Sequence, residues 1–208
     1  MFTERNLRLA EELMETICFF SHKGWTPATS TNYSVRSAEN KNQYIITRSG
    51  VDKSKFKLSD LILINSEREI LSPFNLPGVK SSAETEIHTE IYKLFPDINC
   101  VLHTHSVLGT VLSHLMVKEK ELVFEGLELL KGLEGNMTHE LKVTLPIVPN
   151  SQDIEEILRN MDNRYDNNHG FLIAGHGLYS WGKDIASAKR HIETFEFLFD
   201  CYLTMRRF

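Results

Sequence analysis

Three histidines lie in short motifs that are suited to binding one metal ion. His103 and His105 form a His-x-His pair at the end of an apolar run, and His176 lies between Gly175 and Gly177. Residues i and i+2 of a strand point to the same face, so the two paired imidazoles would lie side by side. The flanking glycines lack side-chain bulk and permit the backbone angles of a tight turn. Catalytic zinc commonly has three protein ligands, imidazoles among them, and one open position, and we therefore predict zinc at these histidines.

Each motif alone has a simpler interpretation. A His-x-His pair can place two polar residues on the solvent face of a strand, and a Gly-His-Gly turn is a weaker signal still. Of the other six histidines only His88, on the face of a predicted helix, has a place from which it could support a ligand. Three histidines at strand ends, with acidic residues in apolar surroundings nearby, favour metal binding over these alternatives.

Two glutamates are candidates for acid/base chemistry. Glu84 opens a predicted helix, where an acidic side chain also interacts favourably with the helix dipole. Glu128 lies in the apolar run Gly-Leu-Glu-Leu-Leu, and we expect partial burial, with a solvent-facing residue on an amphipathic turn as the alternative. Burial would raise the pKa of the carboxyl and prepare it for proton transfer near neutral pH.

The elements that must position these residues follow from the spacing of apolar side chains. Helical spacing predicts helices over 4–22, 84–95, 153–161 and 185–206, and a helical segment from residue 107. Short β-rich runs predict strands over 33–36, 44–48, 60–65, 99–105 and 143–148, and a hairpin over 170–182. Strands and helices do not alternate as strict βαβ units. We therefore predict an α/β fold with a central, largely antiparallel sheet sandwiched between helices.

Composition limits the classes of function. The 208 residues fit one domain over 1–208, and 41% hydrophobic with 25% charged residues is typical of a globular chain. A net charge of −5 argues against general nucleic-acid binding, which needs a basic face. No apolar run is long enough to span a membrane, so we expect no membrane partner. Three widely spaced cysteines in apolar stretches indicate free thiols, and we expect a cytoplasmic protein.

Longer blocks of the sequence resemble the class II aldolase/adducin family. The blocks are TSTNYSVR, ITRSG, SAETEIHTEIYKLFPDINCVLHTHS, ELLKG and GHGLYSWG, and their order and spacing are together highly specific. The resemblance spans nearly the whole chain. It implies a three-layer α/β/α sandwich and zinc held by His103, His105 and His176. It also implies a homotetramer with four-fold symmetry and sites near the subunit boundaries.

Within the family the resemblance is strongest to the branch that dehydrates 5-methylthioribulose 1-phosphate in methionine salvage. It implies loss of water to give a 2,3-diketone phosphate, with Glu128 as the catalytic acid/base. The aldolase branch instead carries a glutamate at the position of Glu84, and this chain has both residues. The alternatives are an aldolase that cleaves fuculose or ribulose phosphate and a non-catalytic adducin-like binding module.

The resemblance also implies a site for the phosphate of a small sugar phosphate. Carried over residue by residue, that site falls on Asn32, Ser49, Gly50 and Ser82. Backbone amides and hydroxyls there would suit a phosphate dianion. Thr31 replaces a glycine of the aldolase pattern, and Ala83 replaces a serine. We expect the nearby charges of Arg48 and Lys53 to be solvated at the surface.

Overall fold

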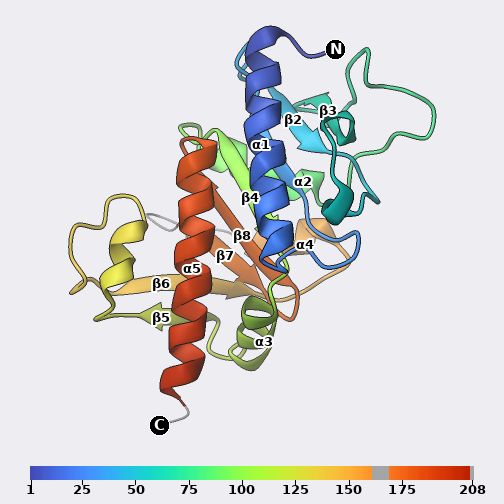
Figure 1. The fold of residues 1–208 in the computed structure, drawn as a ribbon. Helices are drawn as coiled ribbons and strands as arrows, with labels where there is room; N and C mark the ends of the chain where they lie inside the picture. Colours follow the sequence, from blue (N-terminus) through green and yellow to red (C-terminus); the bar gives the residue numbers. More distant parts are fainter. Residues whose placement is uncertain (161–168, 207–208) are drawn as a thin grey trace.

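The computed structural model describes residues 1–160 and 169–206 and contains a central eight-stranded sheet (Figure 1). Its strand order is β3-β2-β1-β4-β8-β7-β6-β5. The strands are β1 (Tyr33–Arg36), β2 (Gln43–Thr47), β3 (Leu61–Asn65), β4 (Cys100–Thr104), β5 (Glu121–Phe124), β6 (Val143–Val148), β7 (Gly170–Ile173) and β8 (Gly177–Gly182). Neighbouring strands are antiparallel except for the parallel pair β6 and β7. The prediction of a largely antiparallel sheet is confirmed.

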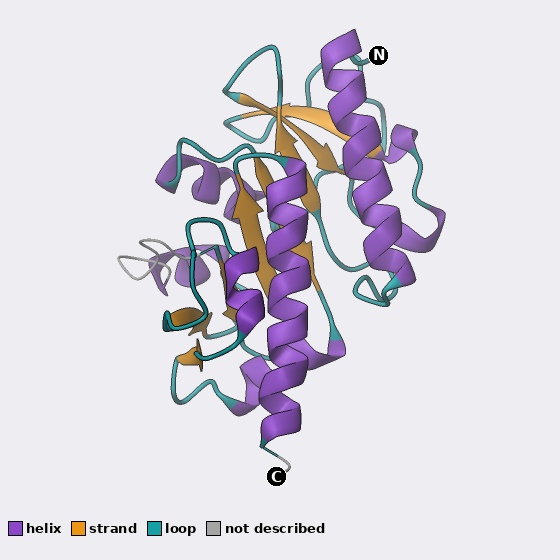
Figure 2. Cartoon of the chain, turned by 60° about the vertical axis from the view of Figure 1, so that its left-hand side comes forward, coloured by secondary structure: helices purple, strands orange, loops and turns teal. Residues whose placement is uncertain are grey.

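Helices cover both faces of the sheet, as the view in Figure 2 shows. They are α1 (Glu4–His22), α2 (Thr85–Leu94), α3 (Val107–Leu115), α4 (Ile154–Asn160) and α5 (Ile185–Met205). Helices α1, α3 and α5 contribute to one apolar core, and α2 and α4 contribute to a second core. The three-layer arrangement expected from the sequence is therefore confirmed.

The two cores exist because consecutive residues of a strand point to opposite faces. In β4, Leu102 packs into the core with α1 and α5, and Val101 packs into the core with α2. In β2, Ile45 and Ile46 divide in the same way. A sheet that is buried on both faces needs continuous apolar runs, which is what these central strands have.

The elements differ from the prediction in a few places. Strand β5, Glu121–Phe124, is not among the strands that the sequence predicts. Helix α4 ends at Asn160, and Met161, where the sequence predicts its last turn, lies outside the described residues. Helix α1 ends as predicted before Gly24, which adopts a positive φ of 75°. Of the helices in the described ranges, none has both the length and the apolar content of a membrane span.

One edge of the sheet gathers the ends of strands that are distant in sequence. The antiparallel pairing places the first residues of β1 and β8 beside the last residues of β2, β4 and β7. The parallel pairing of β6 with β7 adds the end of β6 to the same edge. Side chains just beyond these strand ends therefore meet, whatever their separation along the chain.

Candidate metal centre and its cavity

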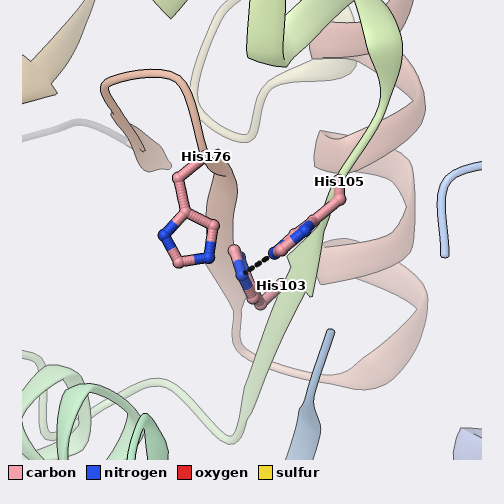
Figure 3. A group of neighbouring side chains, drawn as sticks. All are labelled: His103, His105 and His176. Carbon is pink, nitrogen blue, oxygen red and sulfur yellow. Dashed lines mark hydrogen bonds between the residues drawn. The ribbon is translucent and has the colours of Figure 1, made fainter. Parts of the chain in front are cut away.

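The three predicted ligands converge at this edge of the sheet. His103 lies on β4 and His105 follows its last residue, while His176 lies in the turn between β7 and β8 (Figure 3). One ring nitrogen from each histidine lies within 4.8 Å of the others. The Nε2 atoms of His103 and His105 are 2.7 Å apart. Two segments separated by more than 70 residues thus supply a set of ligand atoms that one ion can bridge.

Glycine makes this convergence possible. Gly175 has a φ of 63°, in the left-handed region that favours glycine. At Gly177 a Cβ atom would lie 2.2 Å from the Thr104 carbonyl oxygen and 3.1 Å from the His103 ring. The turn is also fixed to α3, because the Thr110 hydroxyl donates to the His176 carbonyl at 3.0 Å. The close approach of β8 to β4 therefore requires a residue without a side chain at position 177.

The surroundings of the histidines favour the neutral form that binds metals. His103 donates its Nδ1 hydrogen to the Leu178 carbonyl at 3.0 Å, which leaves the lone pair of Nε2 directed into the site. Burial, with a smaller contribution from the charge of His105, holds the pKa of His103 well below its usual value. Burial lowers the pKa of His105 to about 4. These residues therefore fit a divalent cation, which needs unprotonated imidazole.

Glu84 directs its carboxylate at the same histidines. Its Oε1 lies 3.1 Å from His176 Nε2, and its Oε2 lies 4.0 Å from His103 Nε2. Although Glu84 precedes the first residue of α2, its side chain makes no capping hydrogen bond. Burial raises the pKa of this carboxyl, but the hydrogen bond from His176 and the electrostatic interaction with the three imidazoles outweigh burial and lower it. A charged carboxylate beside the triad would compensate part of the charge of a bound cation.

A buried chain of hydrogen bonds holds Glu84 in place. Its Oε2 accepts a hydrogen bond of 2.7 Å from the Asn32 amide, whose oxygen accepts one from His88 Nε2. His88 Nδ1 is 2.7 Å from the Ser34 hydroxyl, which is 2.9 Å from the Tyr92 hydroxyl. Burial lowers the pKa of His88 to about 3, so this ring is neutral. The direction of each bond follows, because a neutral ring that donates from Nε2 must accept at Nδ1.

The triad opens into a cavity of about 820 Å³. Glu84, His105 and His176 line it, whereas His103 is fully buried behind them. The four predicted phosphate-site residues, Asn32, Ser49, Gly50 and Ser82, also line the cavity. Thr31 also lines the cavity and has a φ of 73°, in the left-handed region that favours glycine. The structure therefore brings the predicted metal and phosphate residues into one space.

The expectation that Lys53 is solvated is wrong. Only 1% of its surface is exposed, and its Nζ donates to the carbonyls of Val51 and Ser30 at 3.0 and 3.3 Å. Burial lowers the pKa of Lys53 to about 8. Lys53 lines the same cavity. Arg48 behaves closer to expectation, with 40% of its side chain exposed and an ion pair of 2.6 Å to Asp60.

The profile of the family described as Class II Aldolase and Adducin N-terminal domain matches residues 11–203. The chain belongs to this family.

Curated relatives within the class II aldolase family match along nearly their whole length. A methylthioribulose-1-phosphate dehydratase of Stenotrophomonas maltophilia is 41% identical over 207 residues, with 99% of this chain and 94% of the relative covered. A protein of the same name from Picosynechococcus sp. is 45% identical over 195 residues, with 93% and 90% covered.

Solved structures of the class II aldolase family share the fold. An L-fuculose 1-phosphate aldolase has a TM-score of 0.76 at 19% identity, with all of this chain and 89% of that chain covered. The L-fuculose-1-phosphate aldolase of Thermus thermophilus has a TM-score of 0.74 at 23% identity, with 96% and 95% covered. At these identities the likeness supports the class II aldolase fold alone.

Glu128 is the predicted residue of this class II aldolase domain that the chain does not bring to its own cavity. Of the two interpretations that the sequence leaves open, the solvent-facing one holds, because 71% of the Glu128 side chain is exposed. In the short 3₁₀ helix Glu128–Gly132, Leu130 points into the core and Glu128 points outward. Lys131, at 2.5 Å, lowers the pKa of the Glu128 carboxyl rather than raising it. The described residues that line the cavity do not include Glu128.

Proposed function

We propose that this chain is a metal-dependent hydro-lyase that removes water from 5-methylthioribulose 1-phosphate to give a 2,3-diketone phosphate. The observation that carries the proposal is the convergence of three imidazoles and a carboxylate at one cavity. Relatives named methylthioribulose-1-phosphate dehydratase, matched over almost the full chain, support the choice of substrate. The place of this reaction would be methionine salvage.

Zinc is the metal that we propose for the site. Three histidines with one open position are a donor set typical of catalytic zinc. Bound there, zinc would act as a Lewis acid on the substrate ketone and make the adjacent C–H bond more acidic. His103, His105 and His176 would hold the ion. Glu84 lies close enough to either complete the resting coordination or contact the substrate.

The other cavity residues have distinct proposed roles. The phosphate would bind at Ser49, Gly50 and Ser82, where hydroxyl and backbone groups line the cavity. Lys53 adds a cation at the same end, and two of its three ammonium hydrogens are already held by carbonyls. Asn32 remains a proposed phosphate contact, although its amide also bonds Glu84 and His88.

We further propose that Glu128 transfers protons in the cavity of a neighbouring subunit of a homotetramer. Its exposure and its absence from the described lining of its own cavity support a role between chains. A cytoplasmic location is part of the same proposal. The three cysteines Cys18, Cys100 and Cys201 are free thiols, which suits a reducing compartment.

Metal analysis combined with turnover tests this function. The purified protein should contain about one zinc per chain, lose activity on chelation and regain it with zinc. It should convert 5-methylthioribulose 1-phosphate to a diketone, and His105→Ala should lose both metal and activity. Absence of bound metal would instead favour a non-catalytic binding module.

An aldolase remains the second candidate because Glu84 lies 3.1 Å from His176 in the cavity. Incubation with fuculose 1-phosphate or ribulose phosphate distinguishes the two reactions. An aldolase would release an aldehyde by breaking a carbon–carbon bond, and a dehydratase would not. Aldehyde release from these sugars, without diketone formation from the thioether substrate, would replace the proposed function.

A further inference from the structure

The cavity follows the edge of the sheet, so its two ends belong to different strands. Residues that follow β2, including Ser49 and Gly50, line one end. Residues that follow β6, including Asn150 and Ile154, line the other end. In the strand order, β4 and β8 with the histidines lie between β2 and β6. A ligand held at the β2 end and at the metal centre therefore points toward β6.

The two ends differ in chemistry. Lys53 and the hydroxyls near it lie at the β2 end. Helix α3 packs against β7 and β8, on the side of the histidines toward β6, and its Val107 and Val111 line the cavity from one face of the sheet. Ile154 of α4 lines the cavity from the other face. Both helices begin just beyond strands that end at this edge, which brings their first turns to the cavity. Aliphatic side chains thus face the β6 end from two directions.

The two valines are unusually open for apolar residues. Val107 is 73% exposed and Val111 is 41% exposed. They are four residues apart, so they lie on the same face of α3. Leu115 continues this row and is 62% exposed, but it does not line the cavity. An apolar ligand group that contacts Val107 and Val111 would remove their surface from water, which is favourable.

We propose that Val107, Val111 and Ile154 form the subsite for the apolar end of the substrate, and that this end is a thioether. The inference rests on the proposed function, because it assumes a linear ketose phosphate. With the phosphate at the β2 end and the ketone beside the histidines, carbon 5 and its substituent extend toward β6. A methylthio group gains from aliphatic contact there, whereas a hydroxyl in its place loses contact with water.

Polar residues at the β6 end of the cavity support the alternative that the substrate carries a hydroxyl, rather than a thioether, at carbon 5. Asn150, Ser151 and Gln152 also line this end and would suit a hydroxyl at carbon 5. Binding of two ligands that differ only at that carbon separates the alternatives. The reduced compounds 5-methylthioribitol 1-phosphate and ribitol 1-phosphate have no ketone and cannot be dehydrated. Their dissociation constants, measured by calorimetry on the metal-loaded full chain, therefore report the subsite independently of turnover.

The wild-type protein should bind the thioether at least about 10-fold more tightly than the hydroxyl compound, in line with the effect of small apolar groups in apolar pockets. The double variant Val107→Ala/Val111→Ala should lose most of this preference and keep its affinity for ribitol 1-phosphate. Alanine is a strong helix former, so α3 should persist. The control Leu115→Ala removes an apolar side chain from the same row outside the cavity and should keep the full preference.

Equal binding of the two ligands by the wild-type protein would overturn the subsite. So would a double variant that retains the preference, or one that loses affinity for both ligands to the same extent. Failure of the proposed function gives a different result, namely no diketone from 5-methylthioribulose 1-phosphate while the thioether preference persists.

Discussion

His88 influences the cavity without lining it. Only 1% of its surface is exposed, and it acts on Glu84 through the Asn32 amide. Asn and Gln amides can rotate by half a turn, and a rotated Asn32 would direct its oxygen at the Glu84 carboxylate. The hydrogen bond from His88 Nε2 to the Asn32 oxygen prevents this. His88 is therefore a positioning residue, because two hydrogen bonds through Asn32 connect it to the Glu84 carboxylate.

Replacing His88 should separate positioning from folding. His88→Leu removes the donor to Asn32 and should lower kcat by about 10-fold or more, a loss typical of outer-shell partners, with a smaller change in KM. His88→Gln places an amide donor in reach of Asn32 and should recover part of kcat. Steady-state kinetics and zinc content of both variants provide the measurement. Equal kcat losses in the two variants would reduce His88 to a packing residue.

At the scale of elements, the turn between β7 and β8 depends on two glycines for different reasons. Gly177→Ala would drive a Cβ against the Thr104 carbonyl at 2.2 Å and the His105 ring at 2.9 Å. The backbone must shift, so we expect about 2–3 kcal/mol of lost stability and at least about 10-fold weaker zinc binding. Gly175→Ala is the matched control, because the added atom would make only ordinary van der Waals contact with His114, at 3.6 Å, but φ is 63°.

Gly175→Ala should lower the free energy of unfolding by about 1–2 kcal/mol, which is the strain of a left-handed residue, and leave zinc affinity nearly unchanged. Urea unfolding gives the stability of each variant, and competition with a chelator of known affinity gives zinc binding. Similar zinc affinities for the two variants would show that the close contact at Gly177 does not set the position of the ligands.

Helix α5 carries a buried acid that makes stability depend on pH. Glu196 is 5% exposed, and burial raises the pKa of its carboxyl to about 8 against a smaller opposing effect of the Ser106 hydroxyl. The unfolded value is about 4.3. The folded state therefore binds this proton more tightly, so the stabilisation is complete below about pH 4.3 and is lost as pH rises toward 8.

Glu196→Gln removes this titration and isolates its contribution. Between about pH 5 and 8 the unfolding free energy of the variant should rise relative to that of the wild-type protein, by at most about 1.4 kcal/mol per pH unit. Because other groups titrate in both proteins, only the difference between the two urea curves is used. A difference that stays constant with pH would mean that Glu196 is charged in the fold.

At the scale of the whole molecule, the sequence predicts those features that many residues of one repeated pattern determine together. Apolar periodicity identifies β4 and α5 because many residues contribute to each pattern. The His103, His105 and His176 cluster is predictable because strand ends meet at a sheet edge. The burial of Lys53 contradicts the prediction, and for Glu128 the sequence leaves burial and exposure open. The burial of Lys53 depends in part on the Ser30 carbonyl in a distant segment. Glu128 faces solvent because Leu130 of the same short helix packs into the core.

The proposed catalytic role of Glu128 requires a second chain. The carboxylate of Glu128 contacts Lys131 and His139 at 2.5 and 3.4 Å, and 71% of its side chain faces solvent. If it serves a neighbouring cavity, Glu128→Gln should keep its zinc and lose turnover. His105→Ala should lose both. Each variant alone would then be inactive for a different reason, and each would retain the group that the other lacks.

Mixed oligomers of the two variants test whether Glu128 acts between chains. Sites built from one chain's histidines and its neighbour's Glu128 would be intact in about one quarter of cases after random 1:1 assembly. Co-expression, or unfolding and refolding together with zinc, should therefore restore about one quarter of wild-type activity. Mixing the folded variants without subunit exchange is the control and should restore none. An acid that acts within its own chain allows no intact site in any mixture, so persistent inactivity of the mixed oligomers would show that Glu128 acts in its own chain.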